Sequence, residues 1–159
     1  ASVIRQPDVL TASSIPWYRQ DEGTVVFEGI MSDMPIDRGN FVFLDGTNNN
    51  RQYSLVQANG VSRWLGVSAG VAQYNINTGS ITAGSVFRHV VAYRLDDFAA
   101  AANGSAGAAD TSGALPIGIN ALRFGTAVAT GGNFMGYARR FSYYRTRFPN
   151  TTIQGLSRV

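Results

Sequence analysis

The chain of 159 residues contains no cysteine and no lysine, and it has a single histidine, His89. Without cysteine, neither a disulfide framework nor a thiolate metal site is available. No run of about 18 apolar residues occurs, so the sequence predicts no membrane-spanning helix and no membrane partner. The first residues also lack the charged and then apolar pattern of a secretory leader, and no signal peptide is expected.

Because lysine is absent, the formal net charge of +3 rests on thirteen arginines. Arginine presents a planar donor fork that grips carboxylates, phosphates and sugar hydroxyls. A nucleic-acid interface would need these side chains clustered on one face or one helix. They are scattered instead, with one dense group between Arg139 and Arg147. We therefore expect no nucleic-acid partner.

The length fits one domain with a sizeable core. The eighteen glycines are spread along the chain, as expected for turns between many short strands, and do not form a linker. Residues 1–14 show no clear period and are predicted to form an N-terminal arm. Residues 15–159 are predicted to form a single domain.

The segment 86–104 has the clearest pattern. Residues 87–93 form a β-branched and aromatic run of strand length. Asp96 and Asp97 then supply turn chemistry, and Asn103-Gly104 suits the positive φ angles of a tight turn. The four alanines between these turns favour a helix by propensity, but they are too few to nucleate one. The segment therefore predicts a central β-hairpin.

Short segments with β patterns recur on both sides of this hairpin, at residues 24–30, 41–44, 53–57, 62–68, 71–77, 121–125 and 134–144. The three segments between residues 53 and 77 predict consecutive antiparallel strands with one buried and one wet face. Residues 151–156 predict a single helical turn. About ten to twelve short strands without an amphipathic helix predict an all-β fold, an antiparallel β-sandwich of the jelly-roll class.

Four stretches carry a family resemblance. They read WYRQDEGTVVFEG from Trp17, FRHVVAYRLDDFAAAANG from Phe87, LPIGINALRFG from Leu115 and FMGYARRFSYYRTRFPNTTIQGLS from Phe134. Together they resemble the concanavalin A-like, laminin-G-like jelly-roll modules of bacteriophage tail and other virion structural proteins. In the last stretch Met135 departs from the family pattern, and the residues that fit it are Gly136, Arg139, Arg140, Tyr143 and Tyr144.

The resemblance covers residues 17–157 and implies a concanavalin A-like fold. It also implies a location on the virion surface or outside the cell, with glycan binding or virion architecture as the function.

Residues for catalysis are sparse. Glycosidic cleavage needs two carboxylates at a suitable separation. The nearest candidates, Asp21, Glu22 and Glu28, are not spaced to place three acids on one strand face. His89 lies on an apolar strand, where a buried core histidine is the more common interpretation, and the chain has no G-x-S-x-G turn. We therefore expect no enzyme.

The polar loops contain oxygen donors of the kind that calcium prefers, at Asp33, Asp37, Asp45 and residues 48–50. No loop has the D-x-D-x-D-G spacing of a calcium loop. We therefore predict no cofactor, and a structural calcium ion is the alternative.

A sugar site needs an aromatic ring that stacks on a pyranose, with amides and arginines that satisfy its hydroxyls. The predicted antiparallel strands supply such a set, namely Tyr53, Trp64, Tyr74, Arg51, Asn75 and Asn50. Burial of Trp64 in the core is the competing interpretation. Strand alternation places Arg63 and Trp64 on opposite faces, so only one of them can belong to the site.

We predict a non-catalytic, lectin-like module of a phage tail or virion structural protein that binds a surface or polymeric glycan. One alternative is an architectural or oligomerisation module of a viral fibre, spike or capsid decoration, with a second copy or another virion protein as partner. The other is an accessory carbohydrate-binding module of a secreted glycosidase.

Overall fold

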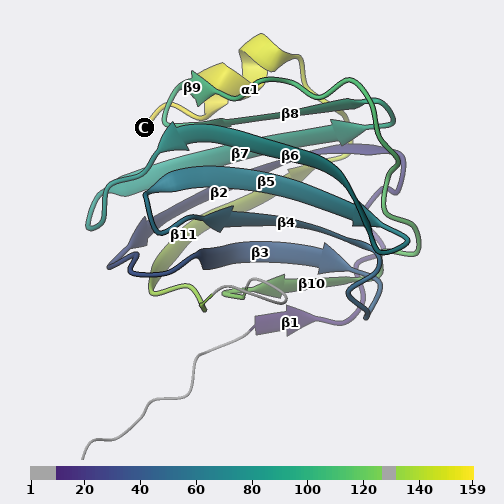
Figure 1. The fold of residues 1–159 in the computed structure, drawn as a ribbon, viewed down its shortest axis with the longest axis horizontal. Helices are drawn as coiled ribbons and strands as arrows, with labels where there is room; N and C mark the ends of the chain where they lie inside the picture. The colour runs from purple at the N-terminus through teal and green to yellow at the C-terminus, as the bar shows by residue number, and fades with distance from the viewer. Residues whose placement is uncertain (1–9, 127–131) are drawn as a thin grey trace, which may run out of the picture.

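The computed structural model describes residues 10–126 and 132–159, which form two antiparallel β-sheets stacked face to face (Figure 1). One sheet has six strands in the order β1-β10-β3-β4-β5-β6, and the other has five in the order β11-β2-β7-β8-β9. The predicted antiparallel β-sandwich is therefore confirmed.

The six-stranded sheet consists of β1 (Leu10–Ala12), β3 (Arg38–Leu44), β4 (Arg51–Val56), β5 (Val61–Ser68), β6 (Val71–Ser80) and β10 (Ala121–Phe124). The five-stranded sheet consists of β2 (Glu22–Met31), β7 (Val86–Arg94), β8 (Asp97–Ala102), β9 (Ser105–Ala106) and β11 (Gly136–Tyr144). The helix α1 spans Asn150–Leu156, where the sequence predicted one helical turn.

The hairpin predicted over residues 86–104 is the pair β7 and β8, and β7 lies between β2 and β8 inside its sheet. Asp96 and Asn103, in the turns at the two ends of β8, have φ angles of 55° and 48°. Short polar side chains tolerate this left-handed conformation better than branched ones, which explains the residues found there. The hairpin prediction is confirmed.

The facing surfaces of the two sheets fill the interior mainly with aromatic rings. The six-stranded sheet contributes Trp64, Phe41 and Phe43, and the other sheet contributes Phe27 and Phe87. All five side chains are buried. Burial of each large apolar side chain contributes roughly 1.5–3 kcal/mol. These rings therefore hold the two layers together.

Polar side chains also lie between the sheets, and Gln52 has two hydrogen-bond partners there. Gln52 accepts a hydrogen bond from the Tyr74 hydroxyl at 2.7 Å and donates one to the Tyr18 hydroxyl. Burial raises the pKa of both tyrosines above the ordinary value, so both remain neutral. These hydrogen bonds allow a glutamine to occupy the core.

A second buried network of polar side chains connects Asn40, Ser54 and His89. The side-chain amide of Asn40 donates to Ser54 Oγ at 2.8 Å, and Ser54 Oγ lies 2.7 Å from His89 Nδ1. Burial lowers the pKa of His89 to about 3, so the imidazole is neutral at pH 7. His89 is thus a buried core residue.

The outer surface of the five-stranded sheet is covered in part by α1 (Figure 1). Ile153 of this helix packs against the small apolar patch formed by Val26, Val90, Ala92 and Ala99. Beside the patch, Arg88 Nε donates to Glu28 Oε2 at 3.0 Å, and Arg88 Nη1 donates to the Leu156 carbonyl oxygen at 3.0 Å. Apolar contact and paired charge together dock the helix.

The N-terminal prediction needs a correction. Residues 1–14 were expected to form an arm, but Leu10–Ala12 forms the edge strand β1, which pairs with β10. The pairing satisfies backbone groups of β10 that an arm would leave at the sheet edge. The rest of the arm prediction, over residues 1–9, lies outside the described residues. Within residues 10–126 and 132–159, the structure contains no helix with the length and hydrophobicity of a membrane span.

Candidate functional site: the arginine face of the six-stranded sheet

The outer surface of the six-stranded sheet gathers polar side chains from four of its strands. One cross-strand row contains Arg123 of β10, Val42 of β3, Tyr53 of β4, Leu65 of β5 and Asn75 of β6. With strands about 4.8 Å apart, the row is roughly 19 Å long. Arg51 and Arg63 each lie two residues before a member of the row, so they share its surface. We name this surface the arginine face and define it by Arg51, Tyr53, Arg63, Asn75 and Arg123.

Tyr53 lies at the centre of the arginine face. Its ring is half-buried against the small apolar cluster of Val42, Leu44 and Ala121. The guanidinium carbon of Arg51 lies 5.4 Å from the centroid of the Tyr53 ring. This cation–π contact and the bond from Arg51 to the Asn48 carbonyl oxygen fix the arginine side chain.

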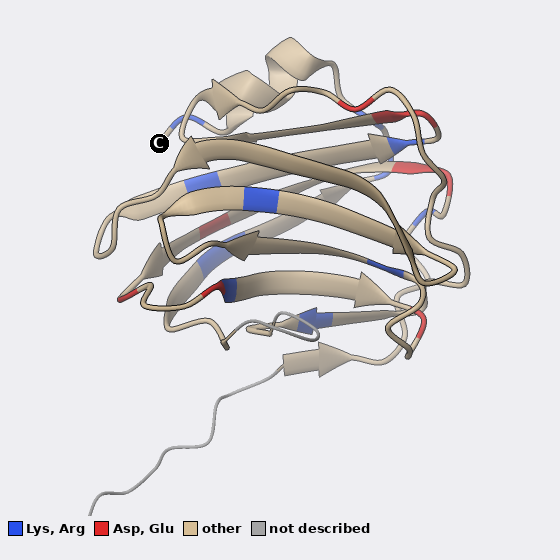
Figure 2. Ribbon diagram, in the orientation of Figure 1, with Lys and Arg blue, Asp and Glu red and all other residues tan. Residues whose placement is uncertain are grey.

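The charge on the arginine face has no acidic counterpart in the described structure. The strands of the six-stranded sheet contain no Asp or Glu, and Figure 2 shows the arginines on β4, β5 and β10 in blue with no red on these strands. Among the described residues, no carboxylate forms an ion pair with Arg51, Arg63 or Arg123. Arg63 Nε instead donates to Asn75 Oδ1 at 2.6 Å. The arginine face therefore carries positive charge that no described carboxylate neutralises.

Two of the predicted sugar-binding residues lie elsewhere. Trp64 and Tyr74 face the interior with exposed fractions of 0% and 2%, so neither ring can stack on a sugar. Arg63 is the outward residue of the alternating pair Arg63 and Trp64, because the large indole gains more from burial than a guanidinium does. The prediction that these two rings are exposed is wrong.

Asn50 has a structural role in its loop. Its amide nitrogen donates to Asp45 Oδ2 at 2.9 Å, and its oxygen accepts from the backbone nitrogen of Ala69 at 3.1 Å. Burial opposes ionisation of Asp45, but hydrogen bonds from Thr47 and Asn50 outweigh it and lower the Asp45 pKa. The amide nitrogen and the amide oxygen of Asn50 are both used in these structural hydrogen bonds, so Asn50 is removed from the candidate sugar site.

The loops proposed for calcium do not converge on one point. Within residues 10–126 and 132–159, no group of three or more His, Cys, Asp or Glu side chains could hold a metal ion. Asp33 pairs with Arg38 at 3.1 Å, and Asp37 accepts from the backbone nitrogen of Ala58 at 3.0 Å. These contacts give the carboxylates structural roles.

The acids considered for glycosidic cleavage are also far apart. Glu22 and Glu28 share one face of β2, but six residues of strand separate them by roughly 20 Å. A pair of catalytic carboxylates needs about 5–9.5 Å. Glu28 is paired with Arg88, and Glu22 with Arg19. Glu22 and Glu28 therefore form ion pairs within the fold and are too far apart to act together in glycosidic cleavage.

The structure joins two further arginines to Arg51, Tyr53 and Asn75. Arg63 was visible in the sequence as the alternative to Trp64, and its position on the outer surface decides between them. Arg123 is 48 residues or more from the other members in the chain and reaches the arginine face only because β10 pairs with β3. No local sequence signal marks it.

No protein-family model and no curated protein sequence matches the chain. Solved structures match it in fold. The carbohydrate-binding module CBM40 of the Ruminococcus gnavus IT-sialidase, with α2,3-sialyllactose bound, gives a TM-score of 0.72 at 13% identity, over 87% of this chain and 83% of that one. The K499G mutant of NanB sialidase from Streptococcus pneumoniae gives 0.73 at 13% identity, over 92% of this chain and 26% of that one.

A SAP-like pentraxin from Limulus polyphemus gives a TM-score of 0.64 at 12% identity, over 86% of this chain and 69% of that one. At such identities the likeness concerns the fold. The chain is a concanavalin A-like jelly-roll β-sandwich, as the sequence resemblance implied. No phage protein is among these three structures, and the phage setting stays a prediction.

Proposed function

We propose that the chain is a non-catalytic carbohydrate-binding module that recognises an acidic glycan through the arginine face. The observation that carries this proposal is the gathering of three arginines, a half-buried tyrosine and an amide on one sheet surface, with no acidic partner in the described residues. The sialyllactose bound to the CBM40 module, which has the same fold, supports a glycan as the ligand class.

The geometry suits a sugar that carries a carboxylate or a sulfate. Guanidinium groups bind such anions through two parallel hydrogen bonds. Arg63 lies diagonally across from Tyr53 on the neighbouring strand, at a spacing of about 7–8 Å, so one or two sugar units can contact both. Arg51 is already held against the Tyr53 ring. This preorganisation reduces the entropy lost on binding.

Isothermal titration with matched glycan pairs tests the proposal. A sulfated and an unsulfated disaccharide differ only in the acidic group, and sialyllactose differs from lactose by one acidic sugar residue. We expect the acidic member of at least one pair to bind at least about tenfold more tightly, and its affinity to fall as sodium chloride rises from about 0.05 to 0.5 M. Equal binding of the members of every pair contradicts the acidic specificity.

Substitutions separate the site from net charge. Arg51→Gln and Arg63→Gln are each expected to weaken acidic-glycan binding about tenfold, because each removes a charge-assisted contact of roughly 1.4 kcal/mol. Arg140→Gln is the matched control, since Arg140 is exposed on the other sheet and bonds Ser142. If all three substitutions weaken binding equally, the effect is one of overall charge and the arginine face is not the site.

The setting of the module is the finer part of the proposal. A phage tail or virion surface is supported by the sequence resemblance, whereas an accessory module of a glycosidase fits the likeness to sialidase modules equally well. Immunogold labelling of virions with antibodies against this chain tests the first setting. Sedimentation velocity tests the architectural alternative, which requires a concentration-dependent oligomer that binds no glycan.

A further inference from the structure

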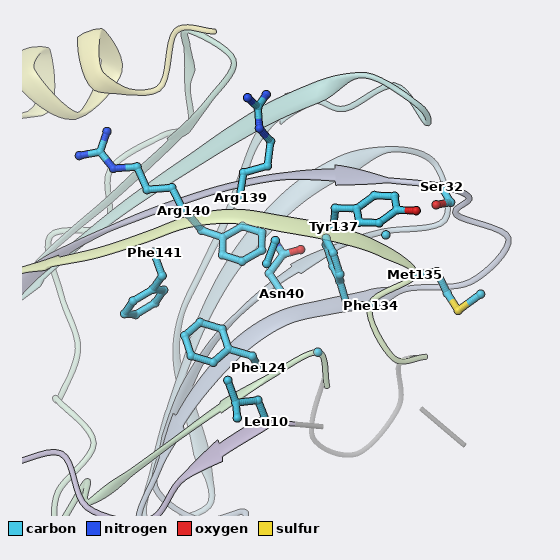
Figure 3. A pocket seen from close by; sticks show the side chains of 14 residues that line it. Leu10, Ser32, Asn40, Phe124, Phe134, Met135, Tyr137, Arg139, Arg140 and Phe141 are labelled. Atoms are coloured by element: carbon cyan, nitrogen blue, oxygen red, sulfur yellow. The ribbon is translucent and has the colours of Figure 1, made fainter. Parts of the chain in front are cut away.

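A cavity opens at the side of the sandwich between β11 of one sheet and β1 and β10 of the other (Figure 3). Its volume is about 780 Å³, within the range of roughly 300–1,000 Å³ that small organic ligands occupy. The apolar side chains that line it are Leu10, Phe27, Phe124, Phe134 and Phe141. It faces the interior of the sandwich, whereas the arginine face lies on the outside.

One buried polar side chain lines this cavity. A β-bulge between Gly39 and Phe41 inserts Asn40 as an extra residue in β3, and its side chain is buried with 1% exposure. Its amide nitrogen is committed to Ser54, and its Oδ1 has no hydrogen-bond partner among the described residues. Figure 3 shows Asn40 among the phenylalanine rings.

An unpaired buried acceptor is costly, because burial removes its hydrogen bonds to water. A ligand that places a donor at this point recovers the lost interaction. The direction of the hydrogen bond between Asn40 and Ser54 supports this role. The Asn40 amide nitrogen donates to Ser54 Oγ, which also lies 2.7 Å from His89 Nδ1, so the Asn40 oxygen remains to accept from a ligand.

The lining favours an aromatic ligand. Phe27 and Phe134 meet edge to face with ring centroids 5.7 Å apart, and Phe124 and Phe141 do so at 4.8 Å. Such pairs present both ring faces and ring edges to a third ring. At the rim, the side chains of Tyr137 and Met135 are exposed, at 73% and 47%. They extend the apolar surface toward solvent.

The charged residues of the lining do not enter the cavity. Arg140 lies opposite Glu28 in the β11–β2 register, and Glu28 points to the outer surface of the sheet. Figure 3 shows the side chains of Arg139 and Arg140 directed away from the phenylalanine rings. The interior therefore offers no charge to an ionised group.

We propose that this cavity binds a neutral aromatic alcohol, whose rings pack among the phenylalanines and whose hydroxyl donates to Asn40 Oδ1. The site is separate from the glycan site of the proposed function.

The test compares 2-naphthol with naphthalene, which lacks the hydroxyl. We expect 2-naphthol to shift the backbone amide NMR signals of the lining residues and to bind about tenfold more tightly than naphthalene, as one hydrogen bond to a buried acceptor predicts. Equal affinity for both probes overturns the role of Asn40. The absence of any shift with either probe overturns the site.

Two variants sharpen the test. Ala138→Trp adds an indole from β11, on a lining position opposite Gly29, and should abolish binding of both probes while the thermal unfolding midpoint stays the same or rises. Asn40→Leu should bind both probes equally. Arg140→Gln should bind 2-naphthol as the parent chain does, because this side chain points away from the rings. Thr152→Ala, at an exposed position of α1 outside the lining, is the matched control. A large loss of 2-naphthol binding in Arg140→Gln, or continued binding in a folded Ala138→Trp variant, overturns the proposed geometry.

Discussion

The strands of the two sheets each contain four arginines, which are Arg38, Arg51, Arg63 and Arg123 in the six-stranded sheet and Arg88, Arg94, Arg139 and Arg140 in the five-stranded sheet. The five-stranded sheet also contains acids, and Arg88, Arg94 and Arg139 each contact one of them. The six-stranded sheet contains none. Its Arg38 pairs with Asp33 from a loop, and its other three arginines lie on the arginine face.

The two surfaces therefore have different physical roles. The outer surface of the five-stranded sheet has an apolar patch under α1 and compensated charges, which is typical of a surface that stabilises the fold. The arginine face carries like charges on neighbouring strands, which repel one another weakly across solvent. Positive charge that no described carboxylate compensates supports the binding role proposed above for the arginine face.

We expect the largest loss of stability at the outer surface of the five-stranded sheet, where α1 covers it. Ile153→Ala removes the residue of α1 that is buried against the five-stranded sheet, and we expect the free energy of unfolding to fall by about 3 kcal/mol. Urea denaturation measures it. Thr152→Ala, at an exposed position of the same helix, is the control and should change stability by less than about 0.5 kcal/mol. A loss below about 1 kcal/mol for Ile153→Ala would mean that α1 does not seal this surface.

The second prediction concerns the layer between the two surfaces. The pKa of His89 is about 3 in the folded chain and 6.5 at its ordinary value, so between these pH values the unfolded chain binds the additional proton. Stability is therefore fully present above pH 6.5 and falls as the pH is lowered, by about 1.4 kcal/mol per unit, or roughly 2 kcal/mol from pH 6.5 to 5.

Urea unfolding curves at pH 7, 6 and 5 measure this slope. His89→Gln cannot take up the proton, and its free energy of unfolding should vary less with pH by the same amount. Parallel pH profiles for the two proteins would show that His89 is not the group that titrates.

The third prediction tests charge compensation on the five-stranded sheet. Glu28 is mostly buried and accepts hydrogen bonds from Arg88, so Glu28→Gln should destabilise the fold by about 1–2 kcal/mol. Asp21→Asn removes an ion pair that is largely exposed and should cost clearly less stability than Glu28→Gln. Chemical denaturation compares the two. Equal losses would remove the distinction between a compensated surface and an ordinary exposed ion pair.

The smallest change in stability is expected on the arginine face. Arg63→Gln on the arginine face should change the free energy of unfolding by no more than about 0.5 kcal/mol, because no described acid loses a partner. The same variant should lose acidic-glycan affinity, as proposed above. Thermal and urea unfolding check the stability, and a loss above about 1 kcal/mol would assign Arg63 to the fold.

Local patterns predicted much of the fold. The β-branched run of β7, the turn residues Asp96 and Asn103, and the alternation in β4 to β6 depend on backbone preferences that act within a few residues. The sequence did not reveal that Leu10–Ala12 extends the six-stranded sheet. That strand forms by pairing with β10, which lies more than 100 residues away along the chain.

The candidate site was harder to predict for the same reason. Alternation showed that Arg63 and Trp64 lie on opposite faces without showing which face is inside. Gln52 and Ser54, which are polar, face inward against the usual pattern, because Tyr18 and His89 supply hydrogen bonds from distant parts of the chain. Tyr53 faces outward as a consequence.

Periodicity and turn chemistry are local properties, and they were enough to predict many short antiparallel strands in two layers. Which side of each strand meets solvent, and which distant residues become neighbours, depends on how the strands pair in the folded protein. Strand pairing sets both at once, because it aligns side chains across the sheet and commits one face of every strand to the partner sheet. That pairing places Arg123 opposite Val42, and Val42 in turn opposite Tyr53, and so creates the arginine face.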